Sequence, residues 1–482
     1  MITISKKIKE KSGITISFVD EPAAEDVTGS GVLVSTPNYN ILLDYGLCQS
    51  NDKYEDFLVN NRKDKNIKAK NIDYIFISHN HSDHSLKVPK LFKEGCNGTV
   101  IISENSTSTL KIMAEDSARI SERDIEIINN QYNKKYKPLY DLDDVNRMLK
   151  HTIEFPMNRK IVLNEEISFE LIPSGHLLGG CQIKLYITCN NITKTICYTG
   201  DIGNKVIDNK FVGKFKPITQ CDVLIAESTY GDRPDLKTGI KQRKTDLNKL
   251  KTIIDTQIHE MNGRVLIPSF AQSRCQQLAY MIYELYKNSD WQPKVYVDSP
   301  LAISIFKNYE EILTGYEKEI FDELLHWKNL FLINDPEESK ALISSKEPCV
   351  IISTAGMCQV GRVRHHLKAL VSEPNATILF VGFSTPGSLA SMLKDTSVKS
   401  INIDTKKYTC KCASYSLNSM SGHAPYKQLL EYYSSVNCNK VVLHHGSKKA
   451  KESLAKELKK EYEKQCKTTK VVCANSGLSF TL

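Results

Sequence analysis

The feature that most constrains this chain is a cluster of four metal-binding side chains within six residues: His79, His81, Asp83 and His84. The apolar run at 72–77, rich in β-branched and aromatic residues, predicts a buried strand just before the cluster. Because 87–92 predicts a helix, we expect a strand-to-helix loop whose side chains converge. Neutral imidazoles and carboxylates suit a divalent metal such as zinc. The alternative is a polar surface turn, but three of the 12 histidines in six positions favour a metal site.

Length and composition predict a multidomain protein without membrane spans. At 482 residues and 41% hydrophobic content, the chain predicts two or more packed domains. It has no run of about 18 uncharged apolar residues, and 1–11 lacks the apolar core of a signal peptide. The 14 cysteines are scattered, which predicts reduced thiols in a cytoplasmic protein. Cys410 and Cys412 have no matching second pair, so we expect them in strands.

Charge permits a polyanionic ligand without requiring one. The net charge is +8, from 64 basic and 56 acidic residues. In the charged tail 448–470, Leu454, Leu458 and Tyr462 recur at i, i+4 and i+8, which predicts an amphipathic helix. Lysines alternate with glutamates there, which favours a solvated helix face over a nucleic-acid-binding tail.

Strand patterns change along the chain. The first 80 residues predict a β-meander, 105–160 predicts helix and loop, and later segments predict further strands. The predicted strands are 14–19, 31–35, 40–44, 72–77, 167–172, 182–187, 195–198 and 222–226.

From about 232, strands and helices alternate, which predicts a mainly parallel sheet with covering helices. The predicted strand and helix pairs are 264–267 with 272–286, 295–297 with 301–312, 350–353 with 361–370, and 377–381 with 387–394. Strands at 440–443 and 471–474 flank the charged helix.

Single polar residues follow several later strands and could complete a metal site. His176, Asp201 and His445 each come just past an apolar run, and Glu227 ends another. Alone, each is more often a satisfied polar residue than a ligand. Together with the first cluster they repeat one arrangement, a polar side chain just past a strand.

These motifs together resemble the metallo-β-lactamase fold and its β-CASP nucleic-acid-processing branch. The resemblance to the metallo-β-lactamase fold rests on HNHSDH (79–84), SGH (174–176), YTGD (198–201) and a late His before Gly. The resemblance to the β-CASP branch rests on ESTYGDR (227–233), SGHA (421–424) and HHG (444–446). Further matches, in the family's order, are VTGS (27–30), LLDYG (42–46), EDSARI (115–120), IPSFAQSR (267–274), DSPLA (298–302), GMCQVGRVRHHLK (356–368) and VGFSTPGSLA (381–390). The chain is similar to the compact two-domain β-CASP ribonucleases, relatives of the pre-mRNA 3′-end endonuclease.

The resemblance implies two zinc ions and a role for each motif residue. His79, His81 and His176 are expected to hold the first zinc, with Asp83, His84 and His445 holding the second and Asp201 bridging both. The implied reaction is phosphodiester hydrolysis by a two-metal mechanism. His423 is expected to be the general acid and Glu227 to orient it, and Asp83 also counts among the catalytic residues.

The resemblance also implies the architecture. We expect an α/β protein in which an αββα metallo-β-lactamase sandwich carries an inserted β-CASP domain with a mainly parallel sheet. The predicted boundaries are 1–231 and 416–482 for the sandwich and 232–415 for the insertion. The expected active site is the cleft between the two parts, and the change of strand pattern near 232 agrees with this division.

Arg274 and Arg362 are candidate substrate-binding residues. Both fall at predicted loop-to-helix starts in the inserted part, where guanidinium groups and helix N-termini favour phosphate. Surface or interdomain salt bridges are the alternative. His365 and His366 fall inside a predicted helix and are expected to be structural.

Three positions depart from the family pattern. Pro425 stands where Asp is frequent, Ser447 where Glu is frequent, and Leu86 where Gly is usual. Every expected metal position and His423 are filled, so we expect an active enzyme. The missing carboxylates are expected to weaken support of the ligands and to reduce the rate.

The leading hypothesis is a zinc-dependent ribonuclease acting on single-stranded RNA. We expect an endonuclease and leave 5′–3′ exonuclease activity open. A DNA-processing β-CASP nuclease is an alternative that His445 disfavours, because the DNA branch typically has another residue there. A small-molecule hydrolase and a non-catalytic RNA-binding scaffold are further alternatives. No membrane partner is expected, and a homodimer is left open.

Overall fold

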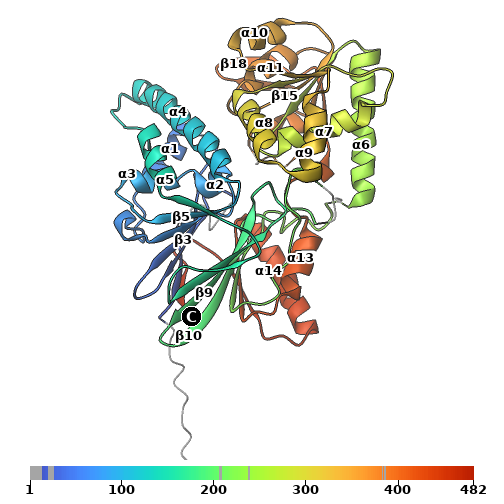
Figure 1. Cartoon of the computed structure of the whole chain (residues 1–482). Coiled ribbons are helices and arrows are strands. Elements are labelled where there is room, and N and C mark those ends of the chain that lie inside the picture. Colours follow the sequence, from blue (N-terminus) through green and yellow to red (C-terminus); the bar gives the residue numbers. More distant parts are fainter. Residues whose placement is uncertain are drawn as a thin grey trace, which may run out of the picture.

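The computed structural model describes residues 13–19, 27–50, 52–205, 209–236, 239–382, 384 and 387–482. Within these residues the chain forms a lower lobe with two seven-stranded sheets and an upper lobe with a six-stranded sheet (Figure 1). Residues 1–11 and positions 383, 385 and 386 of the 381–390 motif lie outside the described residues.

The first sheet of the lower lobe has the order β22-β1-β2-β3-β4-β5-β6. Its strands are β1 (Thr15–Phe18), β2 (Gly31–Ser35), β3 (Asn40–Tyr45), β4 (Tyr74–Phe76), β5 (Thr99–Ser103), β6 (Thr152–Phe155) and β22 (Ser479–Thr481). The predicted meander is right for β1 to β3, which are antiparallel, and wrong for β4, which runs parallel to β3. The reason is the crossover helix α1 (Lys53–Asn61), because a parallel pair needs such a connection.

The second sheet has the order β21-β20-β11-β10-β9-β8-β7. Its strands are β7 (Lys160–Val162), β8 (Ile167–Pro173), β9 (Cys181–Cys189), β10 (Ile192–Tyr198), β11 (Val223–Glu227), β20 (Lys440–His444) and β21 (Lys470–Cys473). Strands β10, β11, β20 and β21 pair in parallel. The segment from 440 onward therefore completes both sheets of the lower lobe, since β22 pairs with β1.

The two sheets pack face to face around an apolar core that includes Val32, Ile41, Phe169, Ile183 and Ile225, all fully buried. Helices cover both outer faces, giving four αββα layers (Figure 1). On the first sheet they are α1, α3 (Val88–Lys93), α4 (Thr107–Tyr132) and α5 (Leu142–Lys150), and on the second α13 (Tyr426–Ser435) and α14 (Lys448–Lys464). The predicted αββα sandwich is confirmed.

Helix α14 confirms the predicted amphipathic pattern of the tail. Leu454, Leu458 and Tyr462 are buried against the second sheet. The lysines and glutamates between them form a solvated face, and neighbouring pairs such as Glu457 with Lys460 bond to one another. This is the arrangement that the alternation of charges predicted.

The upper lobe holds a sheet of order β14-β13-β15-β12-β16-β19, in which every pairing is parallel. Its strands are β12 (Arg264–Pro268), β13 (Val295–Asp298), β14 (Leu330–Leu332), β15 (Cys349–Ser353), β16 (Ala376–Phe380) and β19 (Ala413–Ser416). Its helices are α6 (Ile240–Ile254), α7 (Arg274–Tyr286), α8 (Pro300–Ile312), α9 (Gly315–Leu325), α10 (Pro336–Ser344), α11 (Val363–Leu370) and α12 (Leu389–Lys394). The mainly parallel sheet is confirmed, while the boundaries 1–231, 232–415 and 416–482 stay a prediction.

Some local predictions were wrong. Cys410 and Cys412 lie between strands rather than in them, because the hairpin strand β18 (Lys406–Thr409), paired with β17 (Ser400–Ile403), ends just before. Strand β6 falls within the segment expected to be helix and loop. It is a short, half-exposed edge strand, so its side chains give only a weak apolar pattern.

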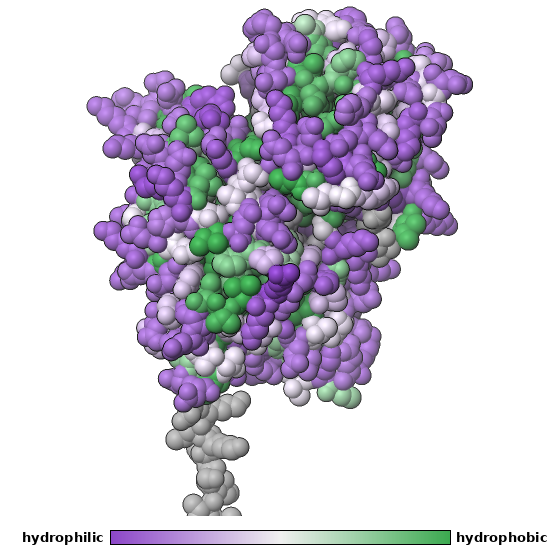
Figure 2. All heavy atoms as spheres, in the orientation of Figure 1, coloured by the Kyte–Doolittle hydropathy of each residue, from purple (hydrophilic) through white to green (hydrophobic). Residues whose placement is uncertain are grey.

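The lobes contact each other beside the strand ends. The side chain of Asn308 on α8 accepts a hydrogen bond from Thr109 of α4 at 2.6 Å and donates one to Ser108 at 2.7 Å. The Gln359 amide donates to the carbonyl of Ser50 across the same boundary. Figure 2 shows a hollow between the lobes on the face in view.

Candidate metal centre

The histidine cluster lies where β4 gives way to the short helix α2 (Ser82–Ser85). His79 and His81 precede the helix, while Asp83 and His84 lie within it. The loop around Gly46 packs tightly against this helix, since a Cβ on Gly46 would lie 1.8 Å from the carbonyl oxygen of Asp83. The expected strand-to-helix loop is thus present, with a helical turn inside the motif.

The other candidate ligands arrive on loops that follow strands of the second sheet. His176 follows β8, Asp201 follows β10, and His445 follows β20. His445 and Asp44, a buried neighbour of the cluster, both adopt left-handed backbone conformations, with φ of 50° and 56°. Such conformations are uncommon for residues other than glycine and concentrate at functional sites.

The first group consists of His79, His81, His176 and Asp201. The His81 Nδ1 lies 3.2 Å from the His79 Nε2 and 3.3 Å from the His176 Nε2. The Asp201 Oδ2 lies 3.6 Å from each of these Nε2 atoms. Four ligands about 2.0–2.1 Å from a tetrahedral zinc ion are separated by roughly 3.3 Å, so the spacing fits that geometry.

The second group consists of Asp83, His84 and His445. The Asp83 Oδ2 lies 3.3 Å from the His445 Nε2 and 4.0 Å from the His84 Nε2. The other oxygen of Asp201 faces this group, 3.4 Å from the His84 Nε2 and 3.1 Å from the His445 Nδ1. Asp201 therefore stands between the two groups with one oxygen toward each.

The hydrogen bonds of three histidines show which ring nitrogen is available to bind a cation. The Ser78 hydroxyl donates to Asp44, so its oxygen accepts from the His79 Nδ1 at 3.0 Å. The His84 Nδ1 faces the Asp44 carboxylate at 2.7 Å, and the His176 Nδ1 faces the Gly422 carbonyl at 3.3 Å. In all three residues the Nε2 atom is left for a cation, as in carboxylate–histidine–metal arrangements.

Two ligand atoms are buried without hydrogen-bond partners, the Nε2 of His84 and the Oδ1 of Asp201. A buried polar atom without a partner is costly, and a bound cation would satisfy both atoms. The donor set and these orphaned atoms therefore fit a divalent metal.

Burial favours neutral imidazoles in the first group. It lowers the pKa of His81 to about 4 and lowers those of His79 and His176 well below their usual range. A neutral imidazole is the form that binds a metal.

In the second group, neighbouring charges outweigh burial in their effect on the pKa values. Burial alone would lower the pKa of His445, but Asp201 raises it to about 10, and Asp201 with Asp83 also raises that of His84. Burial would raise the pKa of Asp83, but His84 and His445 lower it to about 2. Without a metal, the two carboxylates thus favour protonated imidazoles in this group. A bound cation would take the place of those protons as the positive charge beside the carboxylates.

His423 lies at the edge of this centre rather than within either group. Its Nδ1 is buried without a hydrogen-bond partner, 3.6 Å from the Glu227 Oε1 and 3.8 Å from the Asp201 Oδ2. Burial would lower the pKa of His423, but Asp201 and then Glu227 raise it. Glu227 is fixed by the backbone amides of Ile202 and Thr229, which donate to its two oxygens.

The segment 227–230, at the end of β11, contacts both late histidine segments. The Ser228 hydroxyl donates to the carbonyl of His444, and the Thr229 hydroxyl lies 3.3 Å from the His445 Nδ1. The Tyr230 hydroxyl lies 2.7 Å from the Ser421 Oγ, which accepts from the His423 amide at 3.3 Å. One strand end thus aligns His423 and His445.

Arg274 lies beside the centre, at the start of α7. A Cβ on Gly422 would lie 3.0 Å from the Arg274 Nη2 and 3.2 Å from the His176 ring. Burial and then the nearby Arg243 lower the pKa of Arg274 to about 10. The glycine before His423 therefore leaves room for a guanidinium close to the histidines of the first group.

Arg362 is engaged elsewhere. It pairs with Asp298 at 2.7 Å and donates to the carbonyls of Ile333 and Asn334. His366 bonds the other oxygen of Asp298 at 2.6 Å and is fully buried. This geometry favours the salt-bridge alternative for Arg362 and agrees with a structural His366.

The three departures from the family pattern have local structural roles. Ser447 caps α14, its Oγ accepting from the Ala450 amide. Pro425 begins α13 as its N-cap residue, and Leu86 is buried at the end of α2.

Sequence reasoning assigned no role to Asp44, Tyr230 or Phe270, although all three lie in segments that matched the family. Asp44 accepts from Ser78, faces His84 and accepts from the Tyr198 hydroxyl. Phe270 places its ring centroid 6.5 Å from that of His81. The only sequence signal for these residues was the motif that contains each one: LLDYG for Asp44, ESTYGDR for Tyr230 and IPSFAQSR for Phe270.

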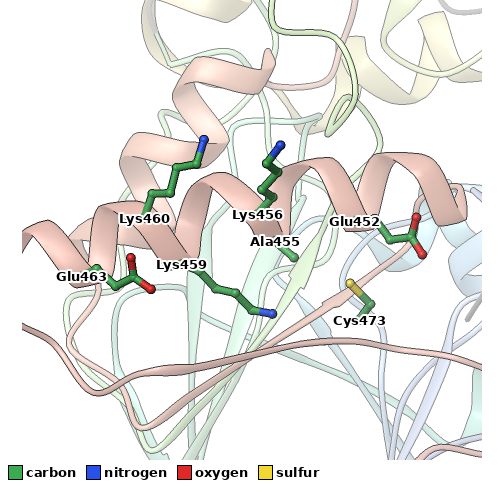
Figure 3. Close-up of a pocket in the computed structure, with 7 residues that line it drawn as sticks. All are labelled: Glu452, Ala455, Lys456, Lys459, Lys460, Glu463 and Cys473. Carbon is green, nitrogen blue, oxygen red and sulfur yellow. The ribbon is translucent and has the colours of Figure 1, made fainter.

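A separate surface pocket lies along α14 (Figure 3). Its lining residues are Glu452, Ala455, Lys456, Lys459, Lys460, Glu463 and Cys473. It shares no residue with the histidine–aspartate groups, and its lysines and glutamates belong to the solvated face of the helix.

Comparisons with known proteins agree with this site. Three segments match known families: the metallo-β-lactamase superfamily at 25–157, the β-CASP domain at 275–393, and the Zn-dependent metallo-hydrolase RNA specificity domain at 407–469. The fold and the site define a metal-dependent hydrolase with a histidine–aspartate metal site. The chain belongs to the β-CASP ribonuclease family of the metallo-β-lactamase superfamily.

Individual relatives cover nearly the whole chain. Probable RNase MJ4 of Methanocaldococcus jannaschii is 30% identical over 434 residues, 88% of this chain and 91% of the relative. Ribonuclease TTHA0252 of Thermus thermophilus is 27% identical over 440 residues, 90% of this chain and 94% of the relative. Transcription termination factor FttA of M. jannaschii is 27% identical over 469 residues, 94% of this chain and 70% of the relative.

A solved structure shares the fold. The crystal structure of a protein of unknown function from Enterococcus faecalis V583 has a TM-score of 0.54 and 13% identity, covering 97% of this chain and all of that one. None of the helices in the described part of the chain combines the length and apolar composition that a bilayer span requires.

Proposed function

We propose that this protein is a zinc-dependent ribonuclease that hydrolyses phosphodiester bonds of single-stranded RNA. The observation that carries the proposal is the convergence of seven histidine and aspartate side chains, from four segments distant in sequence, into two adjoining groups with orphaned polar atoms. Two relatives that cover the chain bear the names ribonuclease and probable RNase, which supports RNA as the substrate.

The two groups are proposed to hold two zinc ions. His79, His81 and His176 hold the first, Asp83, His84 and His445 hold the second, and Asp201 offers one oxygen to each. When bound, paired divalent cations lower the pKa of water and neutralise charge that develops on a phosphoryl group.

His423 is proposed to be the general acid. It lies beside Asp201 without belonging to either ligand group, and its side chain is 20% exposed, so a substrate can reach it. A departing ribose oxygen needs a proton, and a positioned imidazolium can supply it. Glu227, 3.6 Å away and fixed by two backbone amides, orients the ring and favours its protonated form.

Arg274 is proposed to contact a phosphate group of the substrate. Its guanidinium lies next to Gly422 and the His176 ring, and an arginine at a helix start favours a phosphate. Arg362 is not assigned this role, because Asp298 and two carbonyls already engage its guanidinium.

A substrate panel tests the proposal. The zinc-loaded protein is incubated with single-stranded RNA, single-stranded DNA and duplex DNA of one sequence, with and without a chelator. We expect cleavage of single-stranded RNA that is lost on chelation, returns with zinc, and weakens as salt rises, because phosphate contacts release counterions. Faster cleavage of either DNA would favour DNA processing, and zinc-loaded protein that binds RNA without cutting it would favour a scaffold.

The same RNA, labelled at the 5′ end or internally, distinguishes the mode of cleavage on a denaturing gel. Internal cuts give fragments of intermediate length from both labels, whereas 5′–3′ exonuclease action releases single nucleotides from the labelled end. The proposal expects internal cuts.

A further inference from the structure

Phe270 is an exposed aromatic side chain beside the metal centre. It lies in the loop between β12 and α7, where Ser269, Ala271 and Gln272 are all buried. Phe270 is nevertheless 43% exposed. A single exposed apolar ring is common on protein surfaces, so exposure alone assigns Phe270 no role. What distinguishes Phe270 is its place beside the first ligand group.

The position of the ring is well defined. Its centroid lies 6.5 Å from that of the His81 imidazole, with the planes inclined at 43°. A Cβ on Gly356 would lie 3.2 Å from the ring, so the glycine leaves the space that the ring occupies. The Phe270 carbonyl accepts from the Cys275 amide, which ties the loop to the first turn of α7.

A positively charged side chain, Arg274, follows the same loop and also lies near the metal centre. Arg274 lies four residues after Phe270. Its guanidinium and the His176 ring both lie beside Gly422, while the Phe270 ring lies next to that of His81. One loop of the upper lobe thus presents an aromatic ring and a positive charge to two histidines of the first ligand group. An aromatic surface beside a cationic group is how proteins bind single-stranded nucleic acid: bases stack, and phosphates pair with the cation.

We infer that Phe270 is a stacking surface for one nucleobase, that of a nucleotide adjoining the phosphate held at the metal centre. The inference rests on the proposed function, because it needs an RNA strand at this centre. Every base has a π-face, so the contact is tolerant of sequence and sets the register of the strand against His81 and Arg274.

Other exposed aromatic residues provide a contrast. Tyr132 stacks on Tyr54, with centroids 4.2 Å apart. Tyr316, on α9, is 62% exposed and lies near Lys210. Neither contacts a residue of the two ligand groups, so Tyr316→Ala is a matched control for the loss of an exposed ring.

The test is a double-mutant cycle between the protein and the RNA. Binding of a short fluorescent single-stranded RNA to zinc-loaded protein is measured by anisotropy in a His423→Ala background, which limits turnover. The RNA carries one abasic site, placed at each position in turn. The variants are Phe270→Ala, Phe270→Leu, Phe270→Trp and the control Tyr316→Ala, with zinc content and melting temperature measured for each.

We expect Phe270→Ala to weaken binding of intact RNA by roughly 5- to 150-fold, the range for loss of one base–aromatic stack. At one position of the RNA, an abasic site should weaken binding by a similar factor to the protein that retains Phe270. The same abasic site should not weaken binding to Phe270→Ala any further. Phe270→Trp should retain affinity, Phe270→Leu should not, and Tyr316→Ala should be unchanged.

The outcomes are distinguishable. If RNA binds and is cut by the wild type but no abasic position couples to Phe270→Ala, the stacking inference is wrong and the proposed function stands. If Phe270→Leu binds like the wild type, the ring contributes only apolar area and the inference is also wrong. If no variant binds RNA, including the wild type, both are wrong.

Discussion

At the scale of single residues, buried side chains outside the two groups contact the candidate ligands and His423. Asp44 receives hydrogen bonds from Ser78 and Tyr198 and faces the His84 Nδ1. Tyr230 reaches His423 through Ser421. Both are buried, so each acts on the orientation of a neighbour rather than on a substrate.

The first residue-scale prediction concerns Asp44. Asp44→Asn keeps the size of the side chain but removes the carboxylate that orients His84. Zinc affinity of the second group should fall by about 10- to 100-fold, as is typical when the partner of a metal-binding histidine is changed. Competitive titration with a chromophoric chelator should show the second site weakened more than the first, which Asp44 reaches only through Ser78 and His79. Equal weakening of both sites would contradict this role for Asp44.

The second residue-scale prediction concerns Tyr230. Tyr230→Phe removes only the hydroxyl that lies 2.7 Å from the Ser421 Oγ. Because a small displacement of a catalytic group can cost up to about 10²-fold, kcat should fall, while KM and zinc content stay nearly constant. Tyr283→Phe, which loses a surface contact with Glu323, is the matched control. A change in KM without a change in kcat would assign Tyr230 to substrate binding instead.

At the scale of elements, the parallel sheet of the upper lobe is tied to its helices through one buried carboxylate. Asp298 ends β13 and bonds Arg362 at the start of α11, His366 within it, and Ser339 of α10. Burial would raise the pKa of Asp298, but the bonds from His366, Arg362 and Ser339 lower it. One side chain therefore fastens two helices to the carboxyl end of the sheet.

Asp298→Asn should destabilise the upper lobe by on the order of 3 kcal/mol at neutral pH, because it leaves Arg362 without its ion-pair partner. Since folding lowers the pKa of Asp298, its stabilising contribution is complete above the unfolded value of 3.8 and is lost as pH falls through the lower folded value. The difference in unfolding free energy between wild type and variant should therefore shrink below about pH 4. A difference that stayed constant to pH 3 would contradict the ion-pair account.

The elements themselves were largely predictable, because strand and helix signals are local. The apolar run before His79 and the amphipathic spacing in α14 needed no distant partner to be recognised. Strand β6 gave a weak pattern because it is a half-exposed edge, and β4 turned parallel because a helix crosses before it. Contacts such as Asp298 with Arg362, 64 residues apart, depend on packing that no local pattern encodes.

At the scale of the whole molecule, the candidate site is assembled from both lobes. The candidate ligands follow strands of both sheets of the sandwich, whereas Phe270 lies in the loop before α7 of the upper lobe and Arg274 begins that helix. The order of the motifs, through a family resemblance, pointed to candidate ligands that the structure brings together in two groups. The approach of Phe270 to His81, 189 residues earlier, could not be predicted, because it depends on how the lobes pack.

The cleavage rate of His423→Ala tests the central claim most directly. The zinc-loaded variant, the wild type and the exposed-histidine control His326→Ala are compared under single-turnover conditions on single-stranded RNA, with zinc content and RNA affinity measured in parallel. The account predicts a loss of roughly 10²–10⁴-fold in rate, with two zinc ions and RNA affinity retained, and a control that matches the wild type. Cleavage by His423→Ala at the wild-type rate would contradict the account, and loss of zinc would make His423 a ligand or the support of one.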